Sequence, residues 1–168
     1  GIMTALSDCL KKSSMFAHLS DPDLNLLEAS MTRRRYTAGQ VIFHMGDEGG
    51  SLFLLARGRV KVAIPSPEGD EVILAIVSAG EILGELSLID GKPRSATAEA
   101  LEETDVFSLR REDFLNFLSS RFDATLHVLE VLSQRLRETD ASLAEVHFLD
   151  VRSRLSKKII DLARSFGV

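Results

Sequence analysis

Short β-rich segments separated by glycine-containing turns fill the middle of the chain, from Tyr36 to Leu109. Their composition predicts strands at residues 41–43, 51–56, 59–64, 71–77 and 106–109. Gly69-Asp70 is typical of a hairpin tip. Residues 60–64 alternate strictly, so we expect one face of that strand to be buried. Many short strands with frequent glycine turns are typical of an all-β sandwich or jelly roll, which is the fold class we predict.

Helical patterns lie on both sides of this β region. Residues 4–12 form a short amphipathic segment, and Ser20-Asp21-Pro22 signals the start of a helix over residues 22–31. A further helix is expected from Glu112 to about Ser119. The three arginines at residues 33–35 fit either a nucleic-acid patch or the solvated start of a strand. We favour the strand, because three charges do not make a binding surface.

The composition limits the classes of protein to which the chain can belong. Its 168 residues suffice for one domain, and 45% hydrophobic with 27% charged residues indicate a soluble globular protein. There is no run of about 18 apolar residues and no signal-peptide pattern, so we expect a cytoplasmic protein without a membrane span. The single Cys9 excludes an internal disulfide and argues against an iron–sulfur cluster. A net charge of −5 gives no overall basic surface for nucleic acid.

The stretch from Gly84 to Thr97 carries the residues best suited to binding a ligand. After Glu85 it runs through a short apolar turn and then reads Pro-Arg-Ser-Ala, in which Arg94 can direct two N–H donors at one phosphate. Backbone N–H groups of a tight turn can bind the same anion, with the Ser95 hydroxyl beside them. Glu85 can accept from a ribose hydroxyl or orient Arg94. On spacing alone, a surface loop with a chance Arg–Glu pair fits equally well.

A long helix is expected over residues 123–148. Apolar side chains recur along it in steps of three and four, which is the a and d spacing of a coiled coil. The seam consists of Leu129, Leu132, Leu136, Leu143 and Val146, with the polar Thr139 at one d position. We predict a homodimer through this seam; a helix that lies on its own domain is the alternative. In this register Arg135 and Asp140 have the g-to-e′ spacing of an interhelical ion pair.

Gly84-Glu85-Leu86-Ser87-Leu88 followed by Pro93-Arg94-Ser95-Ala96 resembles the phosphate-binding cassette of cyclic-nucleotide-binding domains. Gly46, Gly58 and Gly80 match the turn glycines of such domains. The chain as a whole resembles the sensor part of the cyclic-AMP receptor protein/FNR family of bacterial transcription regulators. The resemblance implies a mainly β fold with flanking helices, a double-stranded β-helix (jelly roll), followed by a long coiled-coil dimerisation helix.

The resemblance also assigns residues to a bound cyclic nucleotide, expected to be cAMP, with cGMP as an alternative. The sugar-phosphate contacts would come from Gly84, Glu85, Leu86, Ser87, Arg94, Ser95 and Ala96. Val62 and Leu74 would lie against the base or ribose, and Arg135 matches a family arginine on the phosphate side of the pocket. Thr139 and Asp140 match the positions that meet the purine, one from each subunit. Asp140 stands where the family member best known for cAMP has Ser, which leaves base specificity open.

The resemblance divides the chain into three parts. Residues 4–120 would form the cyclic-nucleotide-binding domain with its N-terminal helices, and residues 121–149 the dimerisation helix. Residues 150–168 would hold a hinge, which resembles the family's at Phe148-Leu149-Asp150-Val151, and the first helix, Arg154 to Phe166, of a DNA-binding domain that does not continue in this chain. Ligand binding would control DNA binding through that domain, with RNA polymerase as a further partner of the whole protein.

Other functions are compatible with a jelly roll. A cupin-like metalloenzyme needs clustered ligands, whereas His18, His44, His127 and His147 stand in four separate segments, so we expect neither a metal site nor an enzyme. Three alternatives stay open: a haem sensor with His44 or His127 as ligand, a family member that senses cGMP, a cyclic dinucleotide or no ligand, and a regulatory module of a kinase or channel. The long helix and hinge-like segment favour the transcription regulator.

Overall fold

The computed structural model describes the backbone of residues 2–165 and the side chains of residues 5–141 and 158–165. The chain divides into two compact units, Gly1–His127 and Val128–Val168, each of which we describe by itself. None of the described helices is both long enough and apolar enough to cross a membrane.

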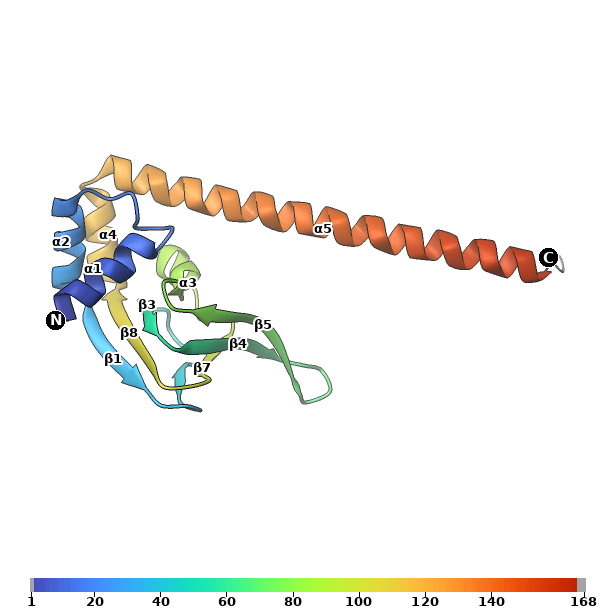
Figure 1. Cartoon of the computed structure of the whole chain (residues 1–168), viewed down its shortest axis with the longest axis horizontal. Coiled ribbons are helices and arrows are strands. Elements are labelled where there is room, and N and C mark those ends of the chain that lie inside the picture. The colour runs from blue at the N-terminus through green and yellow to red at the C-terminus, as the bar shows by residue number, and fades with distance from the viewer. Residues whose placement is uncertain (1, 166–168) are drawn as a thin grey trace. The chain divides into compact units, whose positions relative to one another are not determined.

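Two four-stranded antiparallel sheets form the body of the first unit (Figure 1). One sheet has the order β1-β8-β3-β6, from β1 (Thr32–Tyr36), β8 (Thr104–Arg110), β3 (Ser51–Arg57) and β6 (Ile82–Leu83). The other has the order β2-β7-β4-β5, from β2 (Val41–Phe43), β7 (Thr97–Ala100), β4 (Arg59–Pro65) and β5 (Glu71–Ser78). The predicted jelly roll is confirmed, and the predicted strands appear with only small differences at their ends.

The main core fills the space between the two sheets, because inward-facing side chains of both meet there. It consists of Phe53, Leu55, Val60, Val77, Leu83, Ala98 and Val106, with Tyr36, Ile42, Phe43 and Val62 packed against it. The alternate residues of β3, Leu52 and Leu54, are also fully buried. Helix α1 (Ile2–Lys12) packs against β3, so this strand is covered on both faces and reads as one apolar run.

Strand β4 departs from the alternation that we predicted. Its buried residues are Val60 and Ala63, whereas Val62 and Ile64 are only half-buried. The pairing with β5 shifts at Val62 and Ala63, whose partners are Ala75 and Ile73, so Leu74 of β5 is the extra residue of a β-bulge. Strand β4 itself gains no residue and pairs with β7 without a shift from Val60 to Ala63. The prediction of one strictly buried face was wrong, because Ala63, which alternates with Val60 and Val62, is buried and Ile64 is only half-buried.

The remaining helices of the first unit confirm the expected positions. Helix α2 (Asp21–Ser30) begins at Ser20, whose hydroxyl accepts from the Asp23 N–H, and α4 (Arg111–Ser119) follows β8 directly. Helix α2 packs against both α1 and α4, and Figure 1 shows the three helices together beside the strands. Phe16 and Phe114 make an edge-to-face contact there, with ring centroids 6.3 Å apart.

Helix α5 (Phe122–Ser165) differs from the prediction at its C-terminal end, because it runs without a break through residues 148–151. The segment contains no Gly or Pro that would end a helix. The helix predicted to start separately at Arg154 is therefore the last part of α5. A functional hinge and a domain boundary at this point stay predictions.

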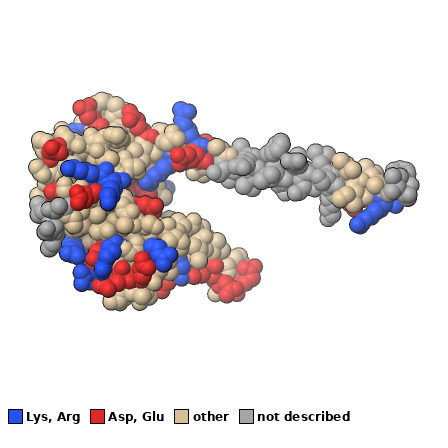
Figure 2. Space-filling view, in the orientation of Figure 1, with Lys and Arg blue, Asp and Glu red and all other residues tan. Residues whose placement is uncertain are grey.

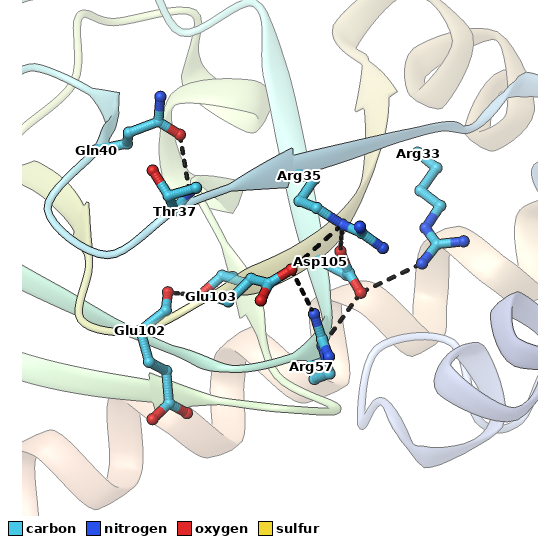
Figure 3. Close-up of polar contacts among 9 residues, drawn as sticks. Arg33, Arg35, Thr37, Gln40, Arg57, Glu102, Glu103 and Asp105 are labelled. Atoms are coloured by element: carbon cyan, nitrogen blue, oxygen red, sulfur yellow. Dashed lines mark hydrogen bonds and ion pairs between the residues drawn. The ribbon is translucent and has the colours of Figure 1, made fainter.

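The three arginines at residues 33–35 lie in β1, as expected, but two of them share a buried partner that the sequence did not reveal (Figure 3). Asp105 on β8 stands directly opposite Arg35 of β1 and Arg57 of β3 in the strand pairing. Its carboxylate contacts Arg35 at 2.8 Å and Arg33 and Arg57 at 3.2 Å each. Basic and acidic side chains are intermixed over the face of the domain that Figure 2 shows.

Asp105 is held as a carboxylate although it is only 5% exposed. Burial acts to raise its pKa, but hydrogen bonds from Arg35 and Arg33 and the charges of Arg35 and Arg57 outweigh burial and lower the pKa below the ordinary 3.8. A carboxylate whose pKa is lowered by folding stabilises the folded state above its unfolded pKa. The contribution is lost as the pH falls through the lowered folded value.

Asp105→Asn keeps the size of the side chain and removes its charge. We expect the free energy of unfolding at pH 7 to fall by about 1–3 kcal/mol, because three arginines lose an ionised acceptor. The difference from the unsubstituted protein should shrink as the pH falls below 3.8. Urea unfolding across this pH range measures both effects.

The matched control is Glu102→Gln, which breaks the exposed pair with Arg59 and should change stability by less than about 1 kcal/mol. Equal effects of the two substitutions at pH 7 would contradict the structural role of Asp105.

Candidate functional site

The segment that we predicted to be a short apolar turn is a helix, α3 (Glu85–Asp90), with a glycine at each end. Gly84 precedes it with φ +85° and Gly91 follows it with φ +71°, both in the left-handed region that favours glycine. The Gly91 N–H donates to the Ser87 carbonyl at 2.9 Å and closes the last turn. Leu88 is fully buried, which fixes one side of α3 to the domain.

Arg94 lies beside the N-terminal end of α3 and is only 5% exposed. Its Nη1 donates to the Gly84 carbonyl at 3.0 Å, and its Nη2 donates to the Ser51 carbonyl at 2.6 Å. Its Nε is buried and has no hydrogen-bond partner in the described part of the chain. A buried donor without an acceptor is costly, so this Nε is a position at which an acceptor would be stabilising.

The surroundings of Arg94 combine aromatic rings with two acidic side chains. Its guanidinium carbon lies 4.2 Å from the centre of the Phe43 ring and 5.8 Å from that of Phe53. Burial lowers the pKa of Arg94, whereas the charges of Asp47 and Glu85 act to raise it. Arginine stays charged in proteins, so the site holds a buried cation whose hydrogen bonds go to neutral carbonyls.

Gly84 is required by the position of this guanidinium as well as by its backbone angle. A Cβ at Gly84 would lie 2.5 Å from Arg94 Nη1 and 3.3 Å from the Ser51 carbonyl oxygen. Gly39 has nearly the same φ, +86°, but a Cβ there would meet nothing within 4 Å. The sequence therefore needs glycine at residue 84 so that Arg94 can approach the start of α3 closely.

The backbone of Arg94 is fixed by the loop after β2. The Arg94 N–H donates to the Asp47 carbonyl, and the Gly46 N–H donates to the Arg94 carbonyl, both at 2.8 Å. Nearby, the Met45 N–H donates to the Thr97 Oγ1 at 2.9 Å. These bonds hold the Pro-Arg-Ser-Ala segment in place before β7 begins.

The other predicted sugar-phosphate residues surround the same point. Glu85 is half-buried as the first residue of α3, and its charge acts on Arg94. Ser95 is exposed directly after Arg94, whereas Ala96 is buried. Leu86 lies on the exposed side of α3 and Ser87 on its buried side. The structure thus brings the two halves of the motif together, and their contacts with a ligand stay predictions.

The two residues predicted to lie against the base or ribose are on neighbouring strands. Val62 of β4 is half-buried and packs against the core between the sheets. Leu74 of β5 is 55% exposed, and Val72, Ile73 and Ile76 on the same strand are exposed as well. Strand β5 is the edge strand of its sheet, and its apolar side chains are exposed to solvent.

The remaining predicted residues lie on α5, in the second unit. The Thr139 hydroxyl donates to the Arg135 carbonyl within the helix at 2.9 Å, and Asp140 is exposed. On the predicted seam, Leu129 and Leu136 are exposed and Leu132 is half-buried. The side chains of Leu143 and Val146 lie outside the described residues. The base contacts and the seam stay predictions.

Sequence reasoning missed three residues that shape the site. Phe43 and Phe53, which lie against Arg94, are apolar strand residues and gave no sign of contact with a cation. Gly49 packs against α3 so closely that a Cβ would lie 2.1 Å from Ser87 Cβ. The adjacent pair Gly49-Gly50 was the available signal, because paired glycines in a loop often mark a close approach of backbone.

Among the described residues, no three His, Cys, Asp or Glu side chains lie close enough together to hold a metal ion. His18 and His127 are nevertheless neighbours, with ring centroids 4.8 Å apart in an edge-to-face arrangement. His127 Nε2 also lies 3.0 Å from the Ser14 carbonyl oxygen.

The comparison with protein families matches the part of the chain that holds this site. The model of the cyclic nucleotide-binding domain matches residues 33–121, which include α3, Arg94 and all eight strands except the first residue of β1. The cyclic AMP receptor protein of Thermus thermophilus is 36% identical over 156 residues, covering 92% of this chain and 72% of the relative.

Solved structures agree with this match. The N-terminal domain of a transcriptional regulator from Streptomyces coelicolor A3(2) is 37% identical, with a TM-score of 0.71 over 81% of this chain and 95% of the other. The Thermus thermophilus catabolite activator protein is 36% identical, with a TM-score of 0.73 over 81% of this chain and 64% of the other. The chain therefore belongs to the cyclic-AMP receptor protein family of cyclic-nucleotide-binding transcription regulators.

Proposed function

We propose that the chain binds cAMP through Arg94 and α3, and that this binding controls the DNA binding of a larger regulator. The observation that carries the proposal is the buried guanidinium of Arg94, which has two carbonyl acceptors and an Nε without one in the described chain. A cyclic phosphate supplies both the missing acceptor and a counter-charge. The name of the Thermus relative, a cyclic AMP receptor protein, favours cAMP.

The groups around Arg94 suit the rest of a cyclic ribose phosphate. The exposed Ser95 can donate its hydroxyl and N–H to the phosphate, with the Ala96 N–H beside them. Glu85 repels a phosphate, but its carboxylate can accept from the ribose 2′-hydroxyl. Gly84, just before α3, and Leu86 and Ser87, in its first turn, would complete the sugar-phosphate site around Glu85.

Base recognition would use residues outside this cassette. We place the base or ribose against Val62 and Leu74, with Arg135 on the phosphate side. Thr139 and Asp140 would read the purine edge, one from each subunit of a homodimer. A carboxylate accepts from the N6 amino group of adenine, but also from the N1–H and N2 amino group of guanine. cGMP is therefore the competing ligand, because Asp140 could accept from either base.

The proposed regulation follows from a ligand that contacts both the β-roll and α5. Such a ligand favours one arrangement of the two α5 helices over another, which is sufficient to shift a two-state population. DNA, and RNA polymerase with it, would be partners of the whole cytoplasmic regulator. Binding of a ligand, rather than catalysis, is the proposed activity of this chain.

Calorimetric titration with cAMP and cGMP, in parallel, tests ligand and site together. We expect saturable cAMP binding that is weakened by about 2–5 kcal/mol in Arg94→Ala, roughly 30-fold or more, because a phosphate loses its buried counter-charge. Arg94→Lys, which keeps the charge but not the fork of donors, should bind with intermediate affinity. Arg59→Ala, at an exposed arginine paired with Glu102, is the matched control and should bind normally.

Binding of neither nucleotide by the unsubstituted protein would refute the proposed ligand. Unchanged affinity of a folded Arg94→Ala would refute the assigned site. Tighter binding of cGMP than of cAMP would replace the ligand and keep the site.

Sedimentation of Leu136→Asp tests the dimer. Leu136 is 63% exposed on α5 in the single chain, and the seam would bury it against a second copy. A charge at this a position should shift the protein towards monomer by a factor of ten or more, because about 2 kcal/mol or more of buried Leu is lost from each side. Ala141→Asp, at an exposed f position of the same helix, is the control and should stay dimeric. A monomeric unsubstituted protein at high concentration with cAMP would contradict the seam.

A further inference from the structure

Arg111, the first residue of α4, lies at the end of α3 that is opposite to Arg94. Its Nε donates to the Leu88 carbonyl in the last turn of α3 at 2.8 Å. Its backbone N–H donates to the Gly50 carbonyl at 2.9 Å. A cation at the C-terminal end of a helix is favourable, because the last carbonyls lack partners within the helix.

The two arginines hold the same two pieces of chain from opposite ends. Arg94 binds the Gly84 carbonyl before α3 and the Ser51 carbonyl at the start of β3. Arg111 binds the Leu88 carbonyl near the end of α3 and the carbonyl of Gly50, the residue before Ser51. Helix α3 and the start of β3 are therefore tied together twice.

Close packing leaves α3 little freedom between these two arginines. A Cβ at Gly49 would lie 2.1 Å from Ser87 Cβ, and a Cβ at Gly91 would lie 3.3 Å from Arg111 Nη2. A displacement of α3 must then move the groups that contact it, since packed segments transmit strain rather than absorb it.

The corner between α4 and α5 is also closely bonded. The Thr125 hydroxyl lies 2.9 Å from the Leu118 carbonyl oxygen and 3.0 Å from that of Arg121. Arg121 forms an ion pair with Asp23 of α2. The end of α4 and the first turn of α5 therefore move together, both within the first unit.

We propose that Arg111 is a positioning residue that couples α3 to α4, and through α4 to the first turn of α5. A phosphate that binds the Arg94 Nε also draws the guanidinium away from the Gly84 and Ser51 carbonyls and so shifts the N-terminal end of α3. Arg111 transfers this shift from the C-terminal end of α3 to α4. The coupling rests on the proposed function, because it needs a phosphate ligand at Arg94.

Arg111→Met removes the side-chain N–H donors and keeps an unbranched side chain that extends as far as the Nε position, while the backbone N–H of residue 111 can still donate to Gly50. Arg111 borders an open hollow of about 500 Å³ together with Gly50, Arg110, Glu112, Leu115 and Asn116, so the substitution opens no cavity in the core. Arg110→Met is the matched control: Arg110, the exposed last residue of β8, borders the same hollow, but its side chain pairs with Asp113 of α4 rather than with α3.

Hydrogen exchange of the two variants and the unsubstituted protein, each with and without cAMP, tests the coupling. In the unsubstituted protein, cAMP should change the exchange of α3 and of residues 118–127. In Arg111→Met the change in α3 should persist, whereas the change at residues 118–127 should fall roughly tenfold, the factor carried by one hydrogen bond from a charged group. Arg110→Met should respond as the unsubstituted protein does.

Calorimetry on the same samples separates the possible failures. If the unsubstituted protein does not bind cAMP, the proposed function fails, and the coupling fails with it. If it binds cAMP and Arg111→Met keeps the full response at residues 118–127, the coupling alone is overturned. A purely structural role of Arg111 would lower the melting temperature and leave that response unchanged.

Discussion

The buried guanidinium of Arg94 needs acceptors and a closely fitted cavity, and the segments around it are arranged to provide both. Its two terminal nitrogens bind carbonyls of Gly84 and Ser51, which belong to segments far apart in the sequence. Phe43 and Phe53 lie against it and replace part of the lost hydration by cation–π contact. Burying a cation against neutral acceptors is costly for folding, and a phosphate ligand would offset that cost.

Helix α3 is a candidate switch, because Arg94 contacts the residue before it and Arg111 of α4 contacts its last turn. Six residues between two left-handed glycines form one rigid unit, which Arg94 holds at its start and Arg111 at its last turn. A ligand that draws donors away from Gly84 acts on the first end, and α4 is bonded to the second. The residues that hold the candidate site together thus also connect it to α4, the helix that leads into α5.

The sequence predicts features that neighbouring residues determine, and it misses features that depend on residues far away in the chain. Strands and helix starts depend on neighbouring residues, so alternation, glycine turns and the Ser20 cap were sufficient for them. The bulge at Leu74 depends on how β5 pairs with β4, and the cluster at Asp105 depends on two other strands. The motif identified Arg94 and Glu85, but Phe43, Gly49 and Arg111 join the site only through tertiary packing. The hinge at residues 148–151 came from resemblance alone, and the local sequence continues the helix.

The Nε of Arg94 is buried without an acceptor in the described chain, and it is the group that a bound phosphate would change most directly. Nitrogen-15 NMR of the arginine Nε–H groups, with Arg94→Lys used for assignment, follows this group during a cAMP titration. We predict that the Arg94 signal moves to the position typical of a strong hydrogen bond to phosphate, in proportion to the calorimetric saturation. A protein that is saturated with cAMP while the Arg94 Nε–H signal stays unchanged would contradict the account.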